Sequence, residues 1–555
     1  MGMIALRVRA GFREPFEEIR VEKGATLADV ADLFRARLPY RALAARVDFQ
    51  VRELNKTVEA PADITFLDMR TNAANLIYQR SLSLLFLKAA RDVLGRCGVF
   101  IENSLNKGFF TVIRGRSLSA RDVAAIEERM RGLVAADLPY VKQRVDKETA
   151  YRFLAEDGYE ERTRMLRQAK DVESVVFYSL DGFRDYFFGQ MAPSTGYIER
   201  FELRKYRNGL LVRFPHYSRP DAIPPYADEK KLYRAFSEAS AWSRLMGISV
   251  AADLNERVEG ERCVEMIQLS EALHEKSVAG IADRVTREKK RVVLIAGPSS
   301  SGKTTFARRL CIQLKVNGLS PLCLGTDDYF LDRQDTPLDE HGEPNFEDLI
   351  SLDLGLFNDN LNALLRGEAI DAPRYDFYLG KKVFGERSLR LMPGQPIVIE
   401  GIHGLNGQLT GGVDDAEKFR IYISPLTALN IDSHNRIPTT DVRLLRRMVR
   451  DHKFRGNGAR NTIATWPKVR AGEDRNIFPF SDEADVLFNS AHTYELAVLK
   501  KYATPLLMEI REDEEEYSEA YRLLRFLQVF REIEDDSAIV NNSILREFIG
   551  GSIFV

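Results

Sequence analysis

The chain has 555 residues, and its 80 basic and 82 acidic side chains leave a net charge of −2. Such a length is too great for one hydrophobic core and predicts about three or four domains. The balanced charge excludes a global field that would draw the whole protein to nucleic acid or to a membrane surface. No apolar run is as long as a membrane span, and the four cysteines form no CxxC pair. We therefore expect a cytoplasmic protein without a membrane partner or a structural zinc site.

The first part of the chain mixes strand and helix patterns. Residues 4–9 alternate apolar and polar side chains as a half-buried strand does, and residues 26–38 have helical spacing. We therefore expect a small β-grasp-like module over residues 1–70. Further helical patterns lie at 73–95 and 119–133, and further strand patterns lie at 175–178 and 210–213. These elements form a second predicted domain over residues 71–218, which ends in a segment rich in proline and aromatic residues.

The rest of the chain predicts a helical region followed by an α/β domain. Helical patterns run from residue 229 to about residue 285, within a helical linker region over residues 219–290, and strands then alternate with helices over residues 291–510. The expected strands are 292–296, 321–325, 396–400, 419–423 and 486–488. This alternation predicts a parallel sheet covered by helices on both faces, with its chemistry at the carboxyl ends of the strands. Residues 511–555 are expected to form a helical extension, in which residues 517–533 pack on the α/β domain.

A glycine-bounded loop follows the first of these strands and opens a helix. Backbone N–H groups in such a loop point into one concavity, with the positive end of the helix dipole behind them, and this arrangement holds a triphosphate. Lys303 is expected to reach the β- and γ-phosphates, and the Thr304 hydroxyl to ligate Mg²⁺. We therefore predict that the protein binds ATP and Mg²⁺. The nucleotide-binding loop comprises Gly297, Pro298, Ser299, Ser300, Ser301, Gly302, Lys303, Thr304 and Thr305.

Phosphoryl transfer to a hydroxyl group also needs a base, an acid near the metal and cations over the transferring phosphate. Asp327 and Asp328 follow the second strand, and Glu400 ends an apolar strand as a metal-binding acid does. The alternatives are that the aspartates only cap a turn and that Glu400 ends a buried strand by chance. A cationic helix follows, with basic residues Arg443, Arg446, Arg447, Arg450 and Arg455. We expect some of these arginines to lie on a solvated face and one or two to close over the phosphate.

With these motifs, residues 291–510 resemble the uridine kinase and phosphoribulokinase family of P-loop kinases. The resemblance makes Asp327, in Thr-Asp-Asp-Tyr-Phe, the general base for a sugar 5′-hydroxyl. Glu400, in Ile-Glu-Gly, matches an acid that helps to bind Mg²⁺, and Glu347, in Asn-Phe-Glu, matches an acid that holds the ribose hydroxyls. Tyr375, in Arg-Tyr-Asp-Phe with Phe377, matches a signature beside the nucleoside pocket.

The resemblance also covers the cationic helix, because residues 446–451 match the family's Arg-Arg-x-x-Arg-Asp lid. It implies that Lys303 and Arg450 stabilise phosphate charge in catalysis. It implies nucleotide binding by Arg447 and Arg455, and Arg447 is also expected to contact the acceptor.

The acceptor site departs from the family pattern at two positions. Gly380 occupies the place of a histidine that reads the base, and Glu347 replaces the family's aspartate. We expect an ATP-dependent kinase for the 5′-hydroxyl of a uridine- or cytidine-like nucleoside. A different hydroxyl acceptor, such as a sugar or a vitamin alcohol, is the alternative within the enzyme class. An RNA-linked regulatory NTPase is the alternative from another class.

Residues 1–215 resemble the amino-terminal region of threonyl-tRNA synthetase, a TGS module followed by an α+β editing domain. The resemblance rests on residues 101–110, 124–130 and 185–196. That family's editing site needs a His-x-x-x-His helix and a Cys-x-x-x-His segment, but residues 79–83 hold no histidine, and Phe187 and Met191 replace the cysteine and the histidine. Without imidazole or thiolate the site cannot bind a catalytic metal in the family's way. We expect a non-hydrolytic binding or regulatory module for tRNA or a small ligand.

Overall fold

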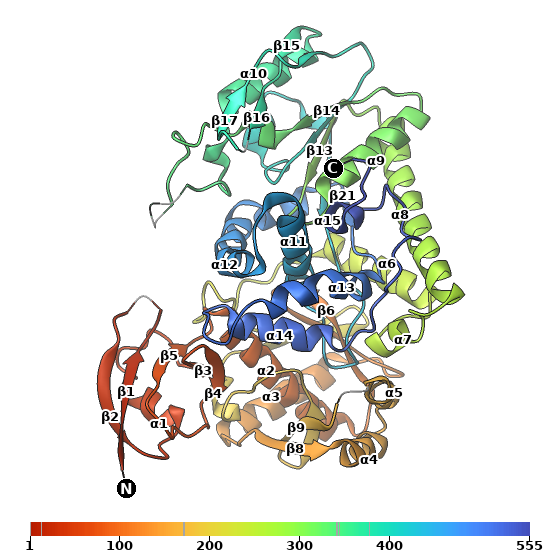
Figure 1. Cartoon of the computed structure of the whole chain (residues 1–555). Coiled ribbons are helices and arrows are strands. Elements are labelled where there is room, and N and C mark those ends of the chain that lie inside the picture. Colours follow the sequence, from red (N-terminus) through yellow and green to blue (C-terminus); the bar gives the residue numbers. More distant parts are fainter. Residues whose placement is uncertain are drawn as a thin grey trace.

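The computed structural model describes residues 2–12, 14–169, 172–339, 342, 344–376 and 378–554 (Figure 1). The chain begins with a five-stranded sheet of order β2-β1-β5-β3-β4, in which β1 and β5 are parallel and the other pairs antiparallel. Its elements are β1 (Met3–Arg9), β2 (Glu17–Glu22), α1 (Leu27–Leu33), β3 (Ala44–Val47), β4 (Gln50–Glu53) and β5 (Asp63–Leu67). Ile4, Leu6 and Val8 point into the core of this module, as their alternation predicts.

The next part contains two antiparallel sheets, of order β11-β12-β7-β6 and β10-β9-β8. Its strands are β6 (Val99–Leu105), β7 (Gly108–Ile113), β8 (Val141–Asp146), β9 (Ser174–Leu180), β10 (Phe183–Tyr186), β11 (Glu202–Tyr206) and β12 (Gly209–Arg213). Its helices are α2 (Asn72–Leu94), α3 (Ala120–Ala135), α4 (Lys147–Asp157) and α5 (Glu160–Gln168). Ser119 caps α3 through a reciprocal pair of hydrogen bonds with Asp122, which confirms the predicted start of this helix.

The α/β part is built on a parallel sheet of order β14-β19-β13-β20-β21. Its strands are β13 (Val292–Ala296), β14 (Leu322–Gly325), β19 (Ile397–Glu400), β20 (Lys418–Ser424) and β21 (Val486–Asn489). Two small two-stranded sheets lie beside it, one formed by β15 (Ala369–Asp371) and β18 (Ser388–Arg390), the other by β16 (Arg374–Asp376) and β17 (Lys381–Val383). Val293 and Ile295 of β13 join one hydrophobic cluster, while Val292 and Leu294 join another. The sheet is therefore buried on both faces, as the alternation of strands and helices predicts.

Helices cover this sheet and connect it to the rest of the molecule. They are α6 (Lys230–Leu245), α7 (Ala251–Asn255), α8 (Glu261–Arg287), α9 (Lys303–Val316), α10 (Leu354–Leu365), α11 (Thr439–Arg455), α12 (Ala459–Asn476), α13 (Glu495–Met508), α14 (Tyr517–Leu527) and α15 (Arg546–Ile549). The expected packing of residues 517–533 is confirmed, because Leu523 and Phe526 of α14 lie in the same core as the sheet. The Ser518 hydroxyl of α14 also donates a hydrogen bond of 2.7 Å to the Phe49 carbonyl. The carboxyl-terminal extension thus contacts both the α/β part and the amino-terminal module.

A buried polar network joins the middle of the chain to the α/β part. The Arg162 guanidinium on α5 forms ion pairs with Asp185 on β10 and with Asp432, the second at 3.0 Å. His434 Nδ1 lies 2.6 Å from the other oxygen of Asp185. Burial opposes ionisation of Asp185, but Arg162 and His434 outweigh it and lower the pKa of Asp185 to about 2. Charges paired in this way hold the two parts of the chain in one arrangement.

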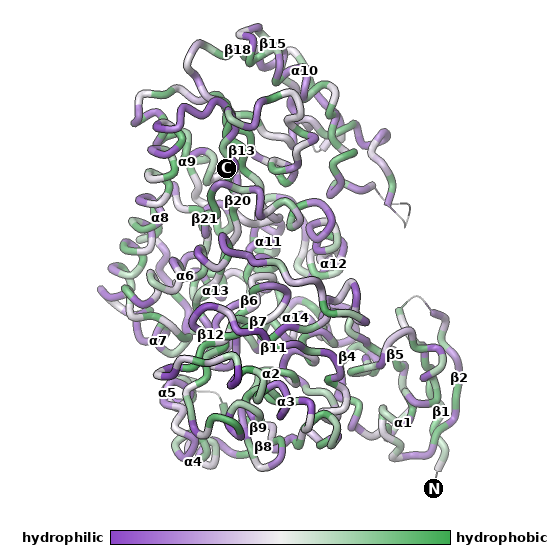
Figure 2. Tube along the Cα trace, turned by 180° about the vertical axis from the view of Figure 1, so that it is seen from behind, coloured by the Kyte–Doolittle hydropathy of each residue, from purple (hydrophilic) through white to green (hydrophobic). Residues whose placement is uncertain are grey.

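Hydrophobic residues occur in short segments along the whole chain (Figure 2). Within the described residues, no helix is both long enough and apolar enough to span a bilayer.

Candidate active site

The predicted nucleotide-binding loop lies between β13 and the first turn of α9. Gly302 caps α9 with a φ of +86°, a left-handed conformation that favours glycine. A side chain at this position would also collide with the side chain of Ile544. The Lys303 ammonium group folds over the loop and donates to the carbonyls of Gly297 and Pro298, at 3.1 and 3.3 Å. The loop therefore has the geometry of an anion cradle at a helix N-terminus.

Thr304 and Glu400, the predicted metal ligands, lie together. The Thr304 hydroxyl donates a 3.0 Å hydrogen bond to Glu400 Oε1, because β19 ends next to β13 in the sheet. Burial, followed by the charge of Asp327, raises the pKa of Glu400 to about 7. A hydroxyl and a withdrawn carboxylate are hard oxygen ligands that fit Mg²⁺, which takes few protein ligands and completes its shell with phosphate and water. Accordingly, the described residues contain no cluster of three or more His, Cys, Asp or Glu side chains able to hold a metal alone.

The two aspartates after β14 have different environments. Asp328 forms a 2.7 Å ion pair with Arg387 and accepts a hydrogen bond of 3.4 Å from the Tyr375 backbone. Asp327 is exposed, and loss of hydration raises its pKa, opposed by the charges of Lys303 and Arg455. Asp328 is therefore engaged in holding the β16 hairpin, and Asp327 is the aspartate that faces the loop lysine.

The arginines of the cationic helix α11 have two kinds of surroundings. Arg443 and Arg446 are not solvated, as some arginines of this helix were expected to be, and they donate to loop carbonyls, Arg443 Nε to Ser299 at 3.0 Å and Arg446 Nη1 to Ser300 at 3.4 Å. Both are completely buried, Arg443 against Glu473 of α12 and Arg446 against Glu495 of α13. Helical spacing alone did not reveal these partners, which lie 30 and 49 residues further along the chain.

The remaining arginines of α11 lie near the nucleotide-binding loop and Asp327. Arg447 Nη1 donates a 2.8 Å hydrogen bond to the Ser299 hydroxyl of the loop. Arg450 pairs with Asp451 at 2.7 Å, and the Arg455 guanidinium lies 3.7 Å from the same carboxylate. Arg450 and Arg455 both act electrostatically on Asp327. The structure thus brings these three predicted residues to the mouth of the nucleotide-binding loop.

Glu347 and Arg447 line a cavity of about 200 Å³, and α12 supplies most of its other residues. Burial, followed by the charge of Glu473, raises the pKa of Glu347 to about 7. Glu347 packs directly on Gly472 of α12, where an added Cβ would lie 2.6 Å from the Cβ of Glu347. This polar cavity next to the loop is the candidate acceptor site.

Tyr375 and Gly380 stand on either side of the turn between β16 and β17. The Tyr375 ring is buried against Phe330, with ring centroids 5.8 Å apart. Gly380 has a φ of +67°, and a Cβ there would lie 3.0 Å from the Arg333 side chain. A histidine would be strained at this position, so the departure from the family pattern is built into the turn. Phe377, the last residue of the matching signature, lies outside the described residues.

Two carboxylates that the sequence analysis missed bind the loop directly. The Ser299 N–H donates to Glu473 Oε1 at 3.0 Å. Both the N–H and the hydroxyl of Thr305 donate to Glu547 Oε2, at 3.2 and 2.7 Å. Glu547 belongs to α15, 242 residues from Thr305, and no local pattern links the two positions. Backbone donors of this kind are the ones that a phosphate would use.

The residues that replace the histidines and the cysteine of the editing site lie on or beside α2. The Gln79 amide donates to Asn75 Oδ1, and the Ser83 hydroxyl donates to the Gln79 carbonyl, so both side chains satisfy their own helix. Phe187 and Met191 are buried in the hydrophobic core of the same part. The arrangement contains no group that could bind a metal or activate water.

Residues 292–497 match the sequence model of the phosphoribulokinase / uridine kinase family. These residues form a domain of that family. The kinase-family domain is 28% identical over 208 residues to a uridine kinase of Staphylococcus aureus, covering 37% of this chain and 91% of that enzyme. A solved D-glycerate 3-kinase from Cryptococcus neoformans is 14% identical, with a TM-score of 0.23, over 46% of this chain and 86% of that one.

A further 202 residues are 25% identical to a threonine–tRNA ligase of Syntrophomonas wolfei. The match covers 36% of this chain but only 31% of the ligase, and a second ligase, from Symbiobacterium thermophilum, is covered to 28%. The chain therefore shares less than a third of the length of these ligases. The chain combines similarity to two protein classes, as the motifs had indicated.

Proposed function

We propose that the protein is an ATP- and Mg²⁺-dependent kinase that phosphorylates a hydroxyl group of a small molecule. The observation that supports the proposal is the proximity of Asp327 to Lys303 and to the Thr304–Glu400 pair. A nucleotide switch needs the loop and the metal ligands, but it does not need a carboxylate aimed at an acceptor.

Each of these side chains has a role in this proposal. Asp327 accepts the proton of the acceptor hydroxyl, and its raised pKa brings it closer to the working pH of a general base. Lys303 and Arg450 offset the negative charge of the phosphoryl group, and Arg447 holds the loop through Ser299. ATP with Mg²⁺ supplies the phosphoryl group when bound, and Thr304 and Glu400 are the residues that would hold the metal.

For the acceptor we propose the 5′-hydroxyl of a nucleoside. The support is the similarity to uridine kinases together with the position of Glu347 in the small cavity beside Arg447. Because Gly380 cannot take the part of a base-reading histidine, we expect weak discrimination between nucleobases. A sugar or a vitamin alcohol is the alternative acceptor.

The test is a phosphate-transfer screen over nucleosides, sugars and vitamin alcohols with detection of products by mass. Asp327→Asn is expected to lower kcat for the best acceptor about 10²- to 10⁴-fold, because the proton acceptor is lost. Asp359→Asn, an exposed aspartate on α10, is the matched control and should keep the parent rate. An Asp327→Asn enzyme that works at the parent rate would disprove the assignment of the base.

A regulatory NTPase linked to RNA is the second candidate, and the similarity to threonine–tRNA ligases favours it. ATP hydrolysis that no acceptor changes, but that tRNA stimulates, would support this candidate and contradict the kinase.

A further inference from the structure

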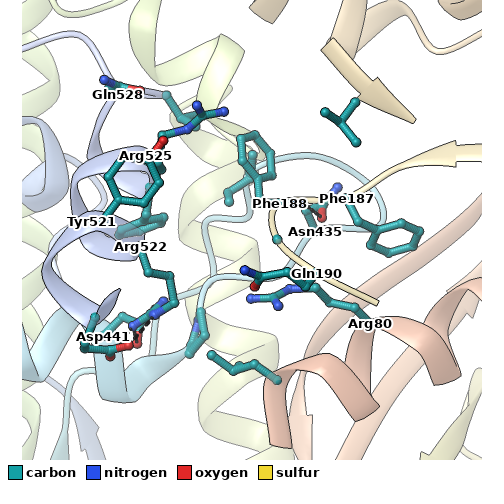
Figure 3. Close-up of a pocket in the computed structure, with 18 of the residues that line it drawn as sticks. Arg80, Phe187, Phe188, Gln190, Asn435, Asp441, Tyr521, Arg522, Arg525 and Gln528 are labelled. Atoms are coloured by element: carbon teal, nitrogen blue, oxygen red, sulfur yellow. Dashed lines mark hydrogen bonds and ion pairs between the residues drawn. The ribbon is translucent and has the colours of Figure 1, made fainter. Parts of the chain in front are cut away.

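Outside the candidate active site, the proposed phosphoryl transfer makes no use of a large cavity of about 1550 Å³ or of a pair of cysteines. One wall of the cavity comes from α2 and the segment after β10, and the opposite wall comes from α14 and the start of α11 (Figure 3). Arg522 on α14 binds both oxygens of Asp441, at 2.7 and 2.9 Å, and both oxygens of Glu519, at 2.8 and 2.7 Å. The charges on this wall therefore offset one another, whereas the cysteine pair retains unused chemistry.

Cys311 and Cys323 are in direct contact, with their Sγ atoms 2.6 Å apart. Cys311 lies on α9, and Cys323 lies on β14, 12 residues further along the chain. Both are free thiols; Cys311 is buried in the core, and Cys323 is half-buried beside it. Two sulfur atoms that already touch can form a bond without a large movement of the backbone.

The two thiols have unequal surroundings. The hydrogen-bonding contact with Cys311 lowers the pKa of Cys323, and burial opposes this effect. The charges of Arg308 and Lys315, which both belong to α9, lower the pKa of Cys323 further. The same contact, followed by burial, raises the pKa of Cys311. Because the thiolate is the nucleophile and Cys323 is the more exposed of the two, Cys323 is the sulfur that reacts first with an oxidant.

The contact connects two elements of the candidate active site. Helix α9 begins with Lys303 and Thr304, and β14 leads directly into Asp327. Strand β14 lies at the edge of the parallel sheet, where it pairs with β19 alone. An edge strand opens more readily than a central one, because fewer hydrogen bonds hold it. A bond between the two sulfurs would therefore fasten the edge strand to the helix of the nucleotide-binding loop.

We propose that Cys311 and Cys323 form a reversible disulfide that locks β14 to α9 when the protein meets an oxidising small-molecule disulfide. Disulfides that form inside a reducing compartment are usually transient and respond to its redox state.

The reaction consists of two thiol–disulfide exchanges. The Cys323 thiolate attacks one sulfur of the small disulfide, whose S–S bond breaks and releases one small thiolate. Cys311 then loses its proton to solvent and attacks the Cys323 sulfur, and the mixed disulfide breaks and releases the second small thiolate. Two cysteine thiols are oxidised, and one small disulfide is reduced to two thiols that take up the two protons. An excess of a small dithiol reverses both exchanges.

The test exposes the full reduced chain to glutathione disulfide, blocks the remaining thiols with iodoacetamide and maps the cysteines by mass. The parent should contain a disulfide between Cys311 and Cys323 that dithiothreitol removes. Cys311→Ala should instead accumulate glutathione on Cys323, because the second thiol is missing. Cys323→Ala should leave Cys311 unmodified, since Cys311 is buried. Cys97→Ala removes a cysteine outside the pair and is the control; it should form the disulfide as the parent does.

Hydrogen exchange measures the lock itself. The backbone amides of β14 should exchange about tenfold more slowly in the oxidised parent than in the reduced parent, because a cross-link suppresses separate opening of the edge strand. Cys97→Ala should gain the same protection on oxidation, and Cys323→Ala should gain none. The proposal is overturned if the parent keeps both thiols free, if Cys323→Ala carries glutathione on Cys311, or if oxidation leaves the exchange of β14 unchanged. None of these outcomes depends on whether the protein proves to be a kinase.

Discussion

Glu547 on α15 occupies donors of the nucleotide-binding loop, and its replacement by glutamine is the most direct perturbation of that contact. The carboxylate accepts from the N–H and the hydroxyl of Thr305 and is buried. Its charge also acts on Glu400 and contributes to the raised pKa of that proposed metal ligand. A triphosphate that uses Thr305 must first displace Glu547. We therefore expect the carboxyl-terminal segment to compete with ATP.

The size of the effect follows from the two hydrogen bonds. A bond to a charged acceptor contributes about 1.5–3 kcal/mol and a neutral one about 0.5–1.5 kcal/mol, so each bond to Thr305 should weaken by about 1 kcal/mol in Glu547→Gln. A total of about 2 kcal/mol corresponds to roughly 30-fold in affinity, and imperfect additivity reduces it to about 5- to 30-fold. ATP should bind more tightly to the variant by this factor. Without ATP, the variant should be less stable, because its loop donors have a weaker partner.

Isothermal titration with ATP and Mg²⁺ measures the affinity for ATP. Thermal unfolding with and without ATP measures the change in stability of the variant. The variant should gain more stability from a given ATP concentration than the parent does. Glu534→Gln, an exposed residue of the same carboxyl-terminal segment, is the control. An ATP affinity equal to or weaker than that of the parent would refute the competition. Weaker Mg²⁺ binding in the same variant would instead assign Glu547 to the surroundings of the metal.

Two further predictions follow from buried charges. Since the pKa of Glu400 is raised to about 7, the folded protein without metal keeps a proton that the unfolded chain loses near pH 4.5. The stability of the metal-free protein should therefore fall as pH rises from about 4.5 to 7. Because Mg²⁺ binds the ionised carboxylate, the Mg²⁺ concentration for half-maximal turnover should fall as pH rises from 6 to 8. A Mg²⁺ requirement that does not change over this range would contradict the role of Glu400. Arg162→Met should lower the free energy of unfolding by about 3–5 kcal/mol in denaturant titrations, because Asp185 and Asp432 stay buried without their cation. Arg164→Met, whose partners are partly exposed, should lower the free energy of unfolding by less than about 1 kcal/mol. Equal losses of stability in the two variants would show that the buried network around Arg162 contributes no more than an exposed ion pair.

Local chemistry explains which features were predictable from the sequence. The loop between β13 and α9 and the cap at Ser119 depend on residues a few positions apart, so their patterns are visible in the chain itself. The proximity of Thr304 to Glu400 was predictable because parallel strands bring their carboxyl ends to one edge of the sheet.

Other features of the candidate active site depend on contacts between distant residues. Arg443 and Arg446 have the helical spacing of a lid, but spacing cannot show that Glu473 and Glu495 bury them. The contact of Glu547 with Thr305 arises from the path of the carboxyl-terminal segment, which tertiary packing decides.

Helix α11 explains how the two halves of the chain can influence each other. Its first turn carries Asp441, which lines the large cavity and binds Arg522. Its middle holds Arg446 in the core, and the next residue, Arg447, donates to the nucleotide-binding loop. Near its end, the Lys453 ammonium donates a 2.6 Å hydrogen bond to the Ile549 carbonyl at the end of α15. Because a packed helix moves as a unit, a change that separates Arg522 from Asp441 would act on Ser299 and on the α15 contact through the same element.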